Sequence, residues 1–126
     1  MQPVSAIELR ETVSIDQDRL ADLYARLGPV EAEGVVCRIL EDLAVLICRV
    51  EADLREGAFD SVCLNAGTLV PIAGDIGLAT LSRVAADAAQ AARRRDLAAT
   101  AATVARLSRI GDRSLVAIWD LQDRSV

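Results

Sequence analysis

The sequence contains no histidine and no lysine, and aromatic residues make up only 2% of its 126 positions. Without an imidazole, the catalytic triads that depend on histidine are excluded. Without a lysine, the glycines cannot form a phosphate-binding loop, whose pattern ends in Lys-Ser or Lys-Thr. The adjacent carboxylates of Glu41 and Asp42 would point about 100° apart on a helix, so they do not form an acid/base pair. We therefore expect that the protein is not an enzyme.

The scarcity of aromatic side chains also disfavours β-strands, in which such residues are enriched. Hydrophobic residues nevertheless make up 52% of the chain, so the core must be built from alanine, leucine, valine and isoleucine, which suits close packing of helices. The net charge is −5 and every basic residue is arginine, which argues against a surface that neutralises nucleic-acid phosphates. We expect one helical domain that does not bind nucleic acid.

Long apolar runs are missing as well. No stretch approaches the roughly 20 residues needed to cross a bilayer, and the N-terminal MQPVSAIELRE lacks the basic and apolar parts of a secretory signal. Cys37, Cys48 and Cys63 have no metal-ligand spacing, so we expect reduced thiols that are buried as small hydrophobic residues. The sequence predicts a cytoplasmic protein with no membrane contact, no metal and no cofactor.

Apolar residues recur at three- and four-residue steps along most of the chain, which is the period of helices packed on one face. Five segments with this pattern are separated by very short turns, and they are expected to start near Ser14, Pro29, Asp60, Asp75 and Asp96. Gly111 is a predicted soft point in the last segment. Because short turns force neighbouring helices to run antiparallel, we expect an all-α, up-and-down four-helix bundle with a short additional N-terminal helix. Residues 1–13 are expected to be an N-terminal extension and 14–126 the bundle domain.

Several side chains have the positions of helix caps. Ser14 begins a Ser-x-x-Gln capping pattern before the first helix. Asp60 and Asp75 are predicted to cap the third and fourth helices, since a short polar side chain can accept bonds from the free N–H groups of a first turn. Phe59 and Leu64 have the spacing of a hydrophobic staple around Asp60.

The third segment is predicted to have two contrasting faces. Its inward stripe is expected to be Val62, Ala66, Leu69 and Ala73. Its outward face is expected to hold Cys63, Gly67, Val70, Pro71 and Gly74. An outward face made of small and apolar groups is typical of a contact surface. Because Pro71 has no N–H to donate to the carbonyl of Gly67, we also expect a kink or local loosening between these two residues.

Three stretches of the sequence have the order of helices and turns found in a known family. They are VEAEGVVCRILEDLAVLICRVEADLREGAFDSV, which contains a turn of the Gly-Ala-Phe-Asp type, then AGDIG, then LATLSRVAADAAQAARRRDLAATAATVARL. They resemble the helix before the active helix, the end of the active helix, and the last two helices of the histidine-containing phosphotransfer (Hpt) domains of bacterial phosphorelays. The resemblance covers roughly Asp16 to Asp120, and it implies a helical bundle.

The same resemblance implies a site that has lost its chemistry. Counted back from Gly77, Gly67 stands at the position of the family's phosphorylated histidine and Val70 at that of its usual lysine, while Pro71 and Ile72 follow at its glycine and serine. A glycine has no nitrogen that can attack an aspartyl phosphate, and a valine cannot steady the charge of a phosphoryl group. The resemblance therefore implies a module of two-component or phosphorelay signalling that carries no phosphate and docks a receiver domain, or another signalling protein, around Gly67.

Other functions for this outward face remain open. It would also suit a homodimer, such as a helical scaffold with no signalling role. A third class, a small-molecule binder, would need a pocket inside the bundle, which an alanine-rich core is too tightly packed to offer. Cys63 lies one turn before Gly67, but no basic neighbour in the sequence activates its thiol, so we expect it to be inert.

Overall fold

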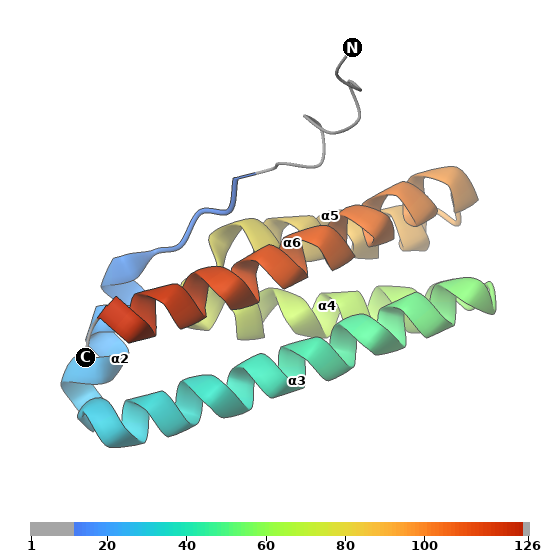
Figure 1. The fold of residues 1–126 in the computed structure, drawn as a ribbon. Helices are drawn as coiled ribbons and strands as arrows, with labels where there is room; N and C mark the ends of the chain where they lie inside the picture. Colours follow the sequence, from blue (N-terminus) through green and yellow to red (C-terminus); the bar gives the residue numbers. More distant parts are fainter. Residues whose placement is uncertain (1–11, 125–126) are drawn as a thin grey trace, which may run out of the picture.

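The computed structural model describes residues 12–124, and α-helices make up most of this part of the chain. The helices, labelled as in Figure 1, are α2 (Gln17–Leu27), α3 (Pro29–Arg55), α4 (Phe59–Asp75), α5 (Ala79–Arg93) and α6 (Leu97–Arg124). Residues 12–124 contain no β-strand, although an isolated antiparallel β-bridge pairs Ile15 with Leu78. The all-α class predicted from the sequence is confirmed.

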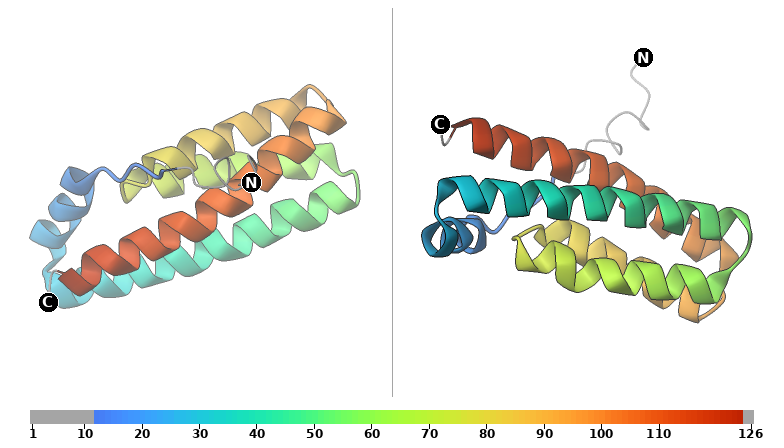
Figure 2. Two further views of the ribbon diagram at one scale, coloured as in Figure 1. Left: turned by 45° about the horizontal axis from the view of Figure 1, so that its top comes forward. Right: turned by 90° about the horizontal axis from the view of Figure 1, so that it is seen from below.

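Helices α3 to α6 form a bundle in which α3 packs against α4, α4 against α5, α5 against α6, and α6 against α3. Successive helices run in opposite directions, as the views in Figure 2 show. Helix α2 lies across one end of the bundle, next to the start of α3 and the last turns of α6 (Figure 1). This arrangement is the predicted four-helix bundle with a short additional helix before it.

The core consists of small and branched aliphatic side chains. From α4 it receives the predicted inward stripe, whose members have no exposed surface: Val62, Ala66, Leu69 and Ala73. Helix α5 contributes a row of buried alanines: Ala85, Ala88, Ala91 and Ala92. Because the distance between packed helices depends on the side chains at their contact, these small residues bring α5 close to its neighbours.

Asp16, and not Ser14 as predicted, caps the start of α2. The Asp16 carboxylate accepts hydrogen bonds from the backbone N–H groups of Asp18 at 3.1 Å and Arg19 at 3.4 Å. The backbone N–H of Ser14 donates instead to the hydroxyl oxygen of Thr80 at 2.7 Å. The segment before α2 is therefore tied to the start of α5. The division of the chain at residue 13 remains a prediction.

The turn between α4 and α5 depends on Gly77, which has a φ of 88°. Its carbonyl accepts a hydrogen bond from the backbone N–H of Asp16 at 2.7 Å, and a Cβ at this position would collide with the Asp16 carbonyl oxygen. Both features restrict the position to glycine. The predicted cap at Asp75 is wrong, because this residue ends α4 and α5 begins after Leu78.

Helix α4 begins at Phe59 with Ala58 as its N-cap residue, so the predicted cap at Asp60 is also wrong. Asp60 lies in the first turn, where a carboxylate interacts favourably with the helix dipole. It forms an ion pair with Arg95, at 2.9 Å, across the other end of the α4–α5 pair. The side chain of Leu64 is 71% exposed, which shows that the predicted staple does not form.

Helix α6 starts as predicted, because the Asp96 carboxylate accepts a hydrogen bond from the backbone N–H of Ala99 at 3.0 Å. The predicted soft point at Gly111 does not interrupt the helix. Gly111 is buried, and a Cβ there would lie 2.6 Å from Cδ1 of Ile47 on α3. The glycine therefore serves the close approach of α6 to α3.

Candidate functional site

The candidate site is the outer side of α4, where the sequence predicts an apolar surface. Among the five predicted residues, Pro71 is exposed, while Cys63, Gly67, Val70 and Gly74 are half-buried. Cys63 and Val70 pack against the edge of the core. The five residues therefore expose less apolar surface than the prediction required.

The reason for this partial burial is the neighbouring helix α5. The Ser82 hydroxyl donates a hydrogen bond to the carbonyl of Val70 at 2.8 Å. A Cβ on Gly74 would lie 3.5 Å from the same hydroxyl oxygen, which is ordinary van der Waals contact. Val70 and Gly74 thus lie along the seam between α4 and α5, and they are only partly available to a partner.

Gly67 and Pro71 lie one turn apart in a helix that continues through both residues. The missing N–H of Pro71 leaves the carbonyl of Gly67 without its usual donor. The backbone nevertheless stays α-helical from residue 67 to residue 71, so the helix is not interrupted, and the kink or local loosening remains a prediction. No atom lies within 4 Å of the place that a Cβ of Gly67 would occupy, which leaves open space outside this position.

Next to this opening, α4 presents a ridge of three residues, which we call the α4 ridge: Leu64, Thr68 and Pro71. Their spacing of four and three residues puts them on one side of the helix, and all three are exposed. The Thr68 hydroxyl donates to the carbonyl of Leu64 at 2.9 Å. Leu64 was not predicted as a surface residue, because its spacing from Phe59 is that of a hydrophobic staple. Its position two turns before Pro71 was the available signal.

A hollow of about 420 Å³ borders the ridge, between the second half of α4 and the starts of α2 and α5. Arg19 of α2 lines it and reaches the carboxylates of Asp16 at 3.9 Å and Asp75 at 4.0 Å. Arg83 of α5 lines the opposite part and is exposed. Arg19 and Arg83 were not predicted as part of the site, because α2, α4 and α5 come together here only through the fold. Charges of both signs around apolar residues are typical of a surface that binds protein.

The polar groups near Gly67 do not form a catalytic arrangement. Asn65 turns toward α3, where its amide donates to the Asp53 carboxylate at 2.7 Å. Cys63 is half-buried and free. Within residues 12–124, no three side chains of histidine, cysteine, aspartate or glutamate gather closely enough to hold a metal ion. The geometry around Gly67 therefore fits docking better than a reaction.

The three cysteines differ in their exposure to solvent. The cysteines are free, but Cys48 is exposed and Cys37 is half-buried, so the expectation of buried thiols is wrong for Cys48.

None of the helices between residues 12 and 124 combines the length and the apolar character needed to cross a bilayer.

Comparison with known proteins supports the fold but not a detailed function. No protein-family model and no curated protein matches the chain. Among solved structures, the chain is similar to histidine-containing phosphotransfer protein B from Pseudomonas aeruginosa PAO1, with a TM-score of 0.81 and 17% sequence identity. The match covers 87% of this chain and 95% of that one. The chain therefore has an Hpt-like fold.

Proposed function

We propose that the protein is a non-phosphorylatable interaction module of two-component or phosphorelay signalling, and that it docks a receiver domain through the surface around Gly67. The observation that carries the proposal is the combination of an Hpt-like fold, matched at a TM-score of 0.81, with a chain that contains no histidine. The proposal further implies that the protein is not an enzyme and that it acts in the cytoplasm.

The chemistry supports binding without phosphoryl transfer. A phosphoryl carrier of this kind needs an imidazole nitrogen as its nucleophile. Counted back from Gly77, Gly67 stands at the position of that histidine. Val70, at the position of the usual lysine, has no charge and donates no hydrogen bond from its side chain. A receiver domain docked here would keep its phosphoryl group, so the protein would act as a competitor or a tether for that receiver.

The docking surface in this proposal is the α4 ridge together with the adjoining hollow. Leu64 and Pro71 supply exposed apolar area, and exposed apolar groups surrounded by polar ones are common in contact surfaces. Arg83 lines the hollow together with Pro71 and is exposed, and a guanidinium group can pair with a carboxylate of the partner.

The direct test is a calorimetric titration of the full chain against receiver domains encoded in the same genome. We expect one or more receivers to bind, and Leu64→Asp to weaken that binding at least tenfold, since it puts a charge into the apolar part of the contact. Val116→Asp is the matched control, because Val116 is 60% exposed on α6 and outside the proposed surface. Absence of binding to every receiver, or equal loss for both variants, would contradict the proposal.

A second test addresses the missing nucleophile. Incubation with a labelled phosphodonor, its kinase and its receiver should leave this protein unlabelled. Acid-labile phosphate on the chain would overturn the proposal that it is non-phosphorylatable.

The same exposed apolar residues favour one alternative, a homodimeric helical scaffold with no signalling role. In that case Leu64 and Pro71 would be buried against a second copy. Light scattering after gel filtration separates the two functions, because the dimer predicts a mass that falls with dilution and is reduced by Leu64→Asp. A monomer at high concentration would eliminate the scaffold.

A further inference from the structure

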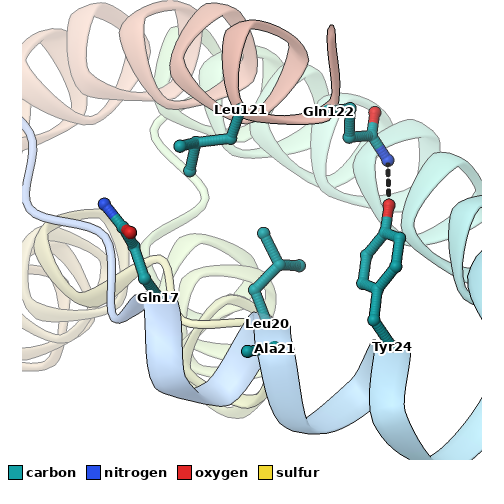
Figure 3. A pocket seen from close by; sticks show the side chains of 6 residues that line it. All are labelled: Gln17, Leu20, Ala21, Tyr24, Leu121 and Gln122. Carbon is teal, nitrogen blue, oxygen red and sulfur yellow. Dashed lines mark hydrogen bonds between the residues drawn. The ribbon is translucent and has the colours of Figure 1, made fainter. Parts of the chain in front are cut away.

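A second hollow lies at the end of the bundle, between α2 and the last turns of α6 (Figure 3). Its volume is about 320 Å³, which is within the range of sites that bind small molecules. The lining residues are Gln17, Leu20, Ala21, Tyr24, Leu121 and Gln122. None of them belongs to the α4 ridge or to the hollow beside it.

The middle of this hollow is apolar, and none of its lining residues is charged. Leu20 and Leu121 face each other across it from α2 and α6 (Figure 3), and Leu20 is continuous with the hydrophobic core. No aspartate, glutamate or arginine lines it. A charged molecule would lose its hydration here without gaining a partner, so the hollow is suited to a neutral one.

The polar groups of the hollow lie at its two ends. At one end the amide Nε2 of Gln122 donates a hydrogen bond to the hydroxyl oxygen of Tyr24 at 3.1 Å. Because the hydroxyl oxygen is the acceptor in this bond, Tyr24 keeps its own hydrogen for another acceptor. Gln17 lies at the other end of the hollow, on the far side of the two leucines (Figure 3).

The side-chain amide of Gln122 is part of this polar end of the hollow. Its side chain is only 6% exposed, and its Oε1 has no hydrogen-bond partner among the described residues. Buried amide oxygens are nearly always paired. Rotation of the amide by half a turn would let Oε1 accept a hydrogen bond from the Tyr24 hydroxyl. In the orientation that the structure shows, Nε2 donates to the hydroxyl oxygen, and the hydroxyl hydrogen is available to a ligand.

We propose that this hollow binds a neutral molecule with an apolar body and a carbonyl group. The body occupies the space between Leu20 and Leu121, and the carbonyl oxygen accepts a hydrogen bond from the Tyr24 hydroxyl. Such a ligand would join α2 to the end of α6. The inference is independent of the proposed docking of a receiver domain, because the two sites share no residue.

The test uses three probes of similar shape, acetophenone, ethylbenzene and benzoate, titrated against the full chain and followed by the backbone amide signals in NMR spectra. We expect shifts confined to α2 and the last turns of α6. Acetophenone should bind about two- to tenfold more tightly than ethylbenzene, which is the net worth of one hydrogen bond, and benzoate should bind least.

Two variants separate the carbonyl contact from the shape of the hollow. Tyr24→Phe should remove the preference for acetophenone and leave the affinity for ethylbenzene unchanged. Ala21→Trp should fill the hollow and abolish binding of both, whereas the control Ala102→Trp, at an exposed site near the start of α6, should have no effect. Equal affinities of the wild-type protein for acetophenone and ethylbenzene, a preference that survives Tyr24→Phe, or shifts elsewhere in the chain would overturn the proposal.

Discussion

Replacing Gly67 by alanine is expected to raise the free energy of unfolding by about 0.5–1 kcal/mol. Gly67 lies within α4 and does not have a positive φ, so an alanine can adopt its backbone conformation. No atom lies within 4 Å of the added Cβ, so the methyl group causes no clash. The gain arises because alanine has less backbone freedom to lose on folding than glycine.

The measurement is urea denaturation followed by far-UV circular dichroism. We expect the midpoint to increase with an unchanged slope, and the melting temperature to rise by roughly 4 °C for 1 kcal/mol in a chain of this size. Gly34→Ala is the matched control, since Gly34 is exposed inside α3 and its added Cβ also meets no atom within 4 Å. Both variants should gain stability by a similar amount.

A loss of stability in Gly67→Ala, with a gain in Gly34→Ala, would refute the reasoning. It would mean that the backbone between Gly67 and Pro71 is not a regular helix, or that the space outside Gly67 is occupied. A small change in both variants would show instead that helix propensity contributes less in this bundle than in the reference systems.

Three further substitutions, at Gly111, Asp96 and Gly67, have expected outcomes. Gly111→Ala should destabilise the fold by about 1–3 kcal/mol in the same denaturation assay, because its Cβ would crowd Ile47, and a gain in stability would show that Ile47 moves aside freely. Asp96→Ala should cost about 1 kcal/mol, because it removes the cap that accepts the N–H of Ala99; an unchanged midpoint would contradict this role. Gly67→His should acquire acid-labile phosphate from a phosphorylated receiver that binds the protein, and an unlabelled variant would show that an imidazole at this position, with Val70 at the usual lysine position, does not restore phosphoryl transfer.

The helices were predictable from the sequence because their signal is local. The stripe of Val62, Ala66, Leu69 and Ala73 repeats at helical spacing, and the structure buries all four side chains completely. The same spacing, with very short turns, leaves an antiparallel bundle as the compact arrangement. Any neighbouring helix with an apolar face can cover such a stripe. The burial of the stripe can therefore be predicted without knowing which helix covers it.

The ends of the helices were less predictable, because aspartate has several uses near a helix start. Asp16 and Asp96 accept backbone N–H groups as caps. Asp60 pairs with Arg95 instead, and Asp75 lies at the end of α4 beside Arg19. Which use applies depends on backbone angles and on residues brought close by the fold, and neither is visible in a local pattern.

The candidate site was predictable in position but not in exposure. Helical spacing separates the inward stripe of α4 from Cys63, Val70 and Gly74, but it cannot tell how far α5 covers the opposite side. The bond between Ser82 and the carbonyl of Val70 joins residues on two helices, and the closeness of these helices depends on their small side chains. Leu64, assigned to a staple, is 71% exposed.

Pro71 shows why the outer side of α4 can change while the fold is kept. A proline inside a helix costs about 3 kcal/mol or more, through the lost hydrogen bond and the contact of its ring with a carbonyl. Here that carbonyl belongs to Gly67, where a Cβ would meet open space. On the inner side, Ala66, Leu69 and Ala73 are fully buried before and after the proline, and their packing holds the helix together across it. Substitutions at the exposed positions of the α4 ridge therefore leave these core contacts unchanged.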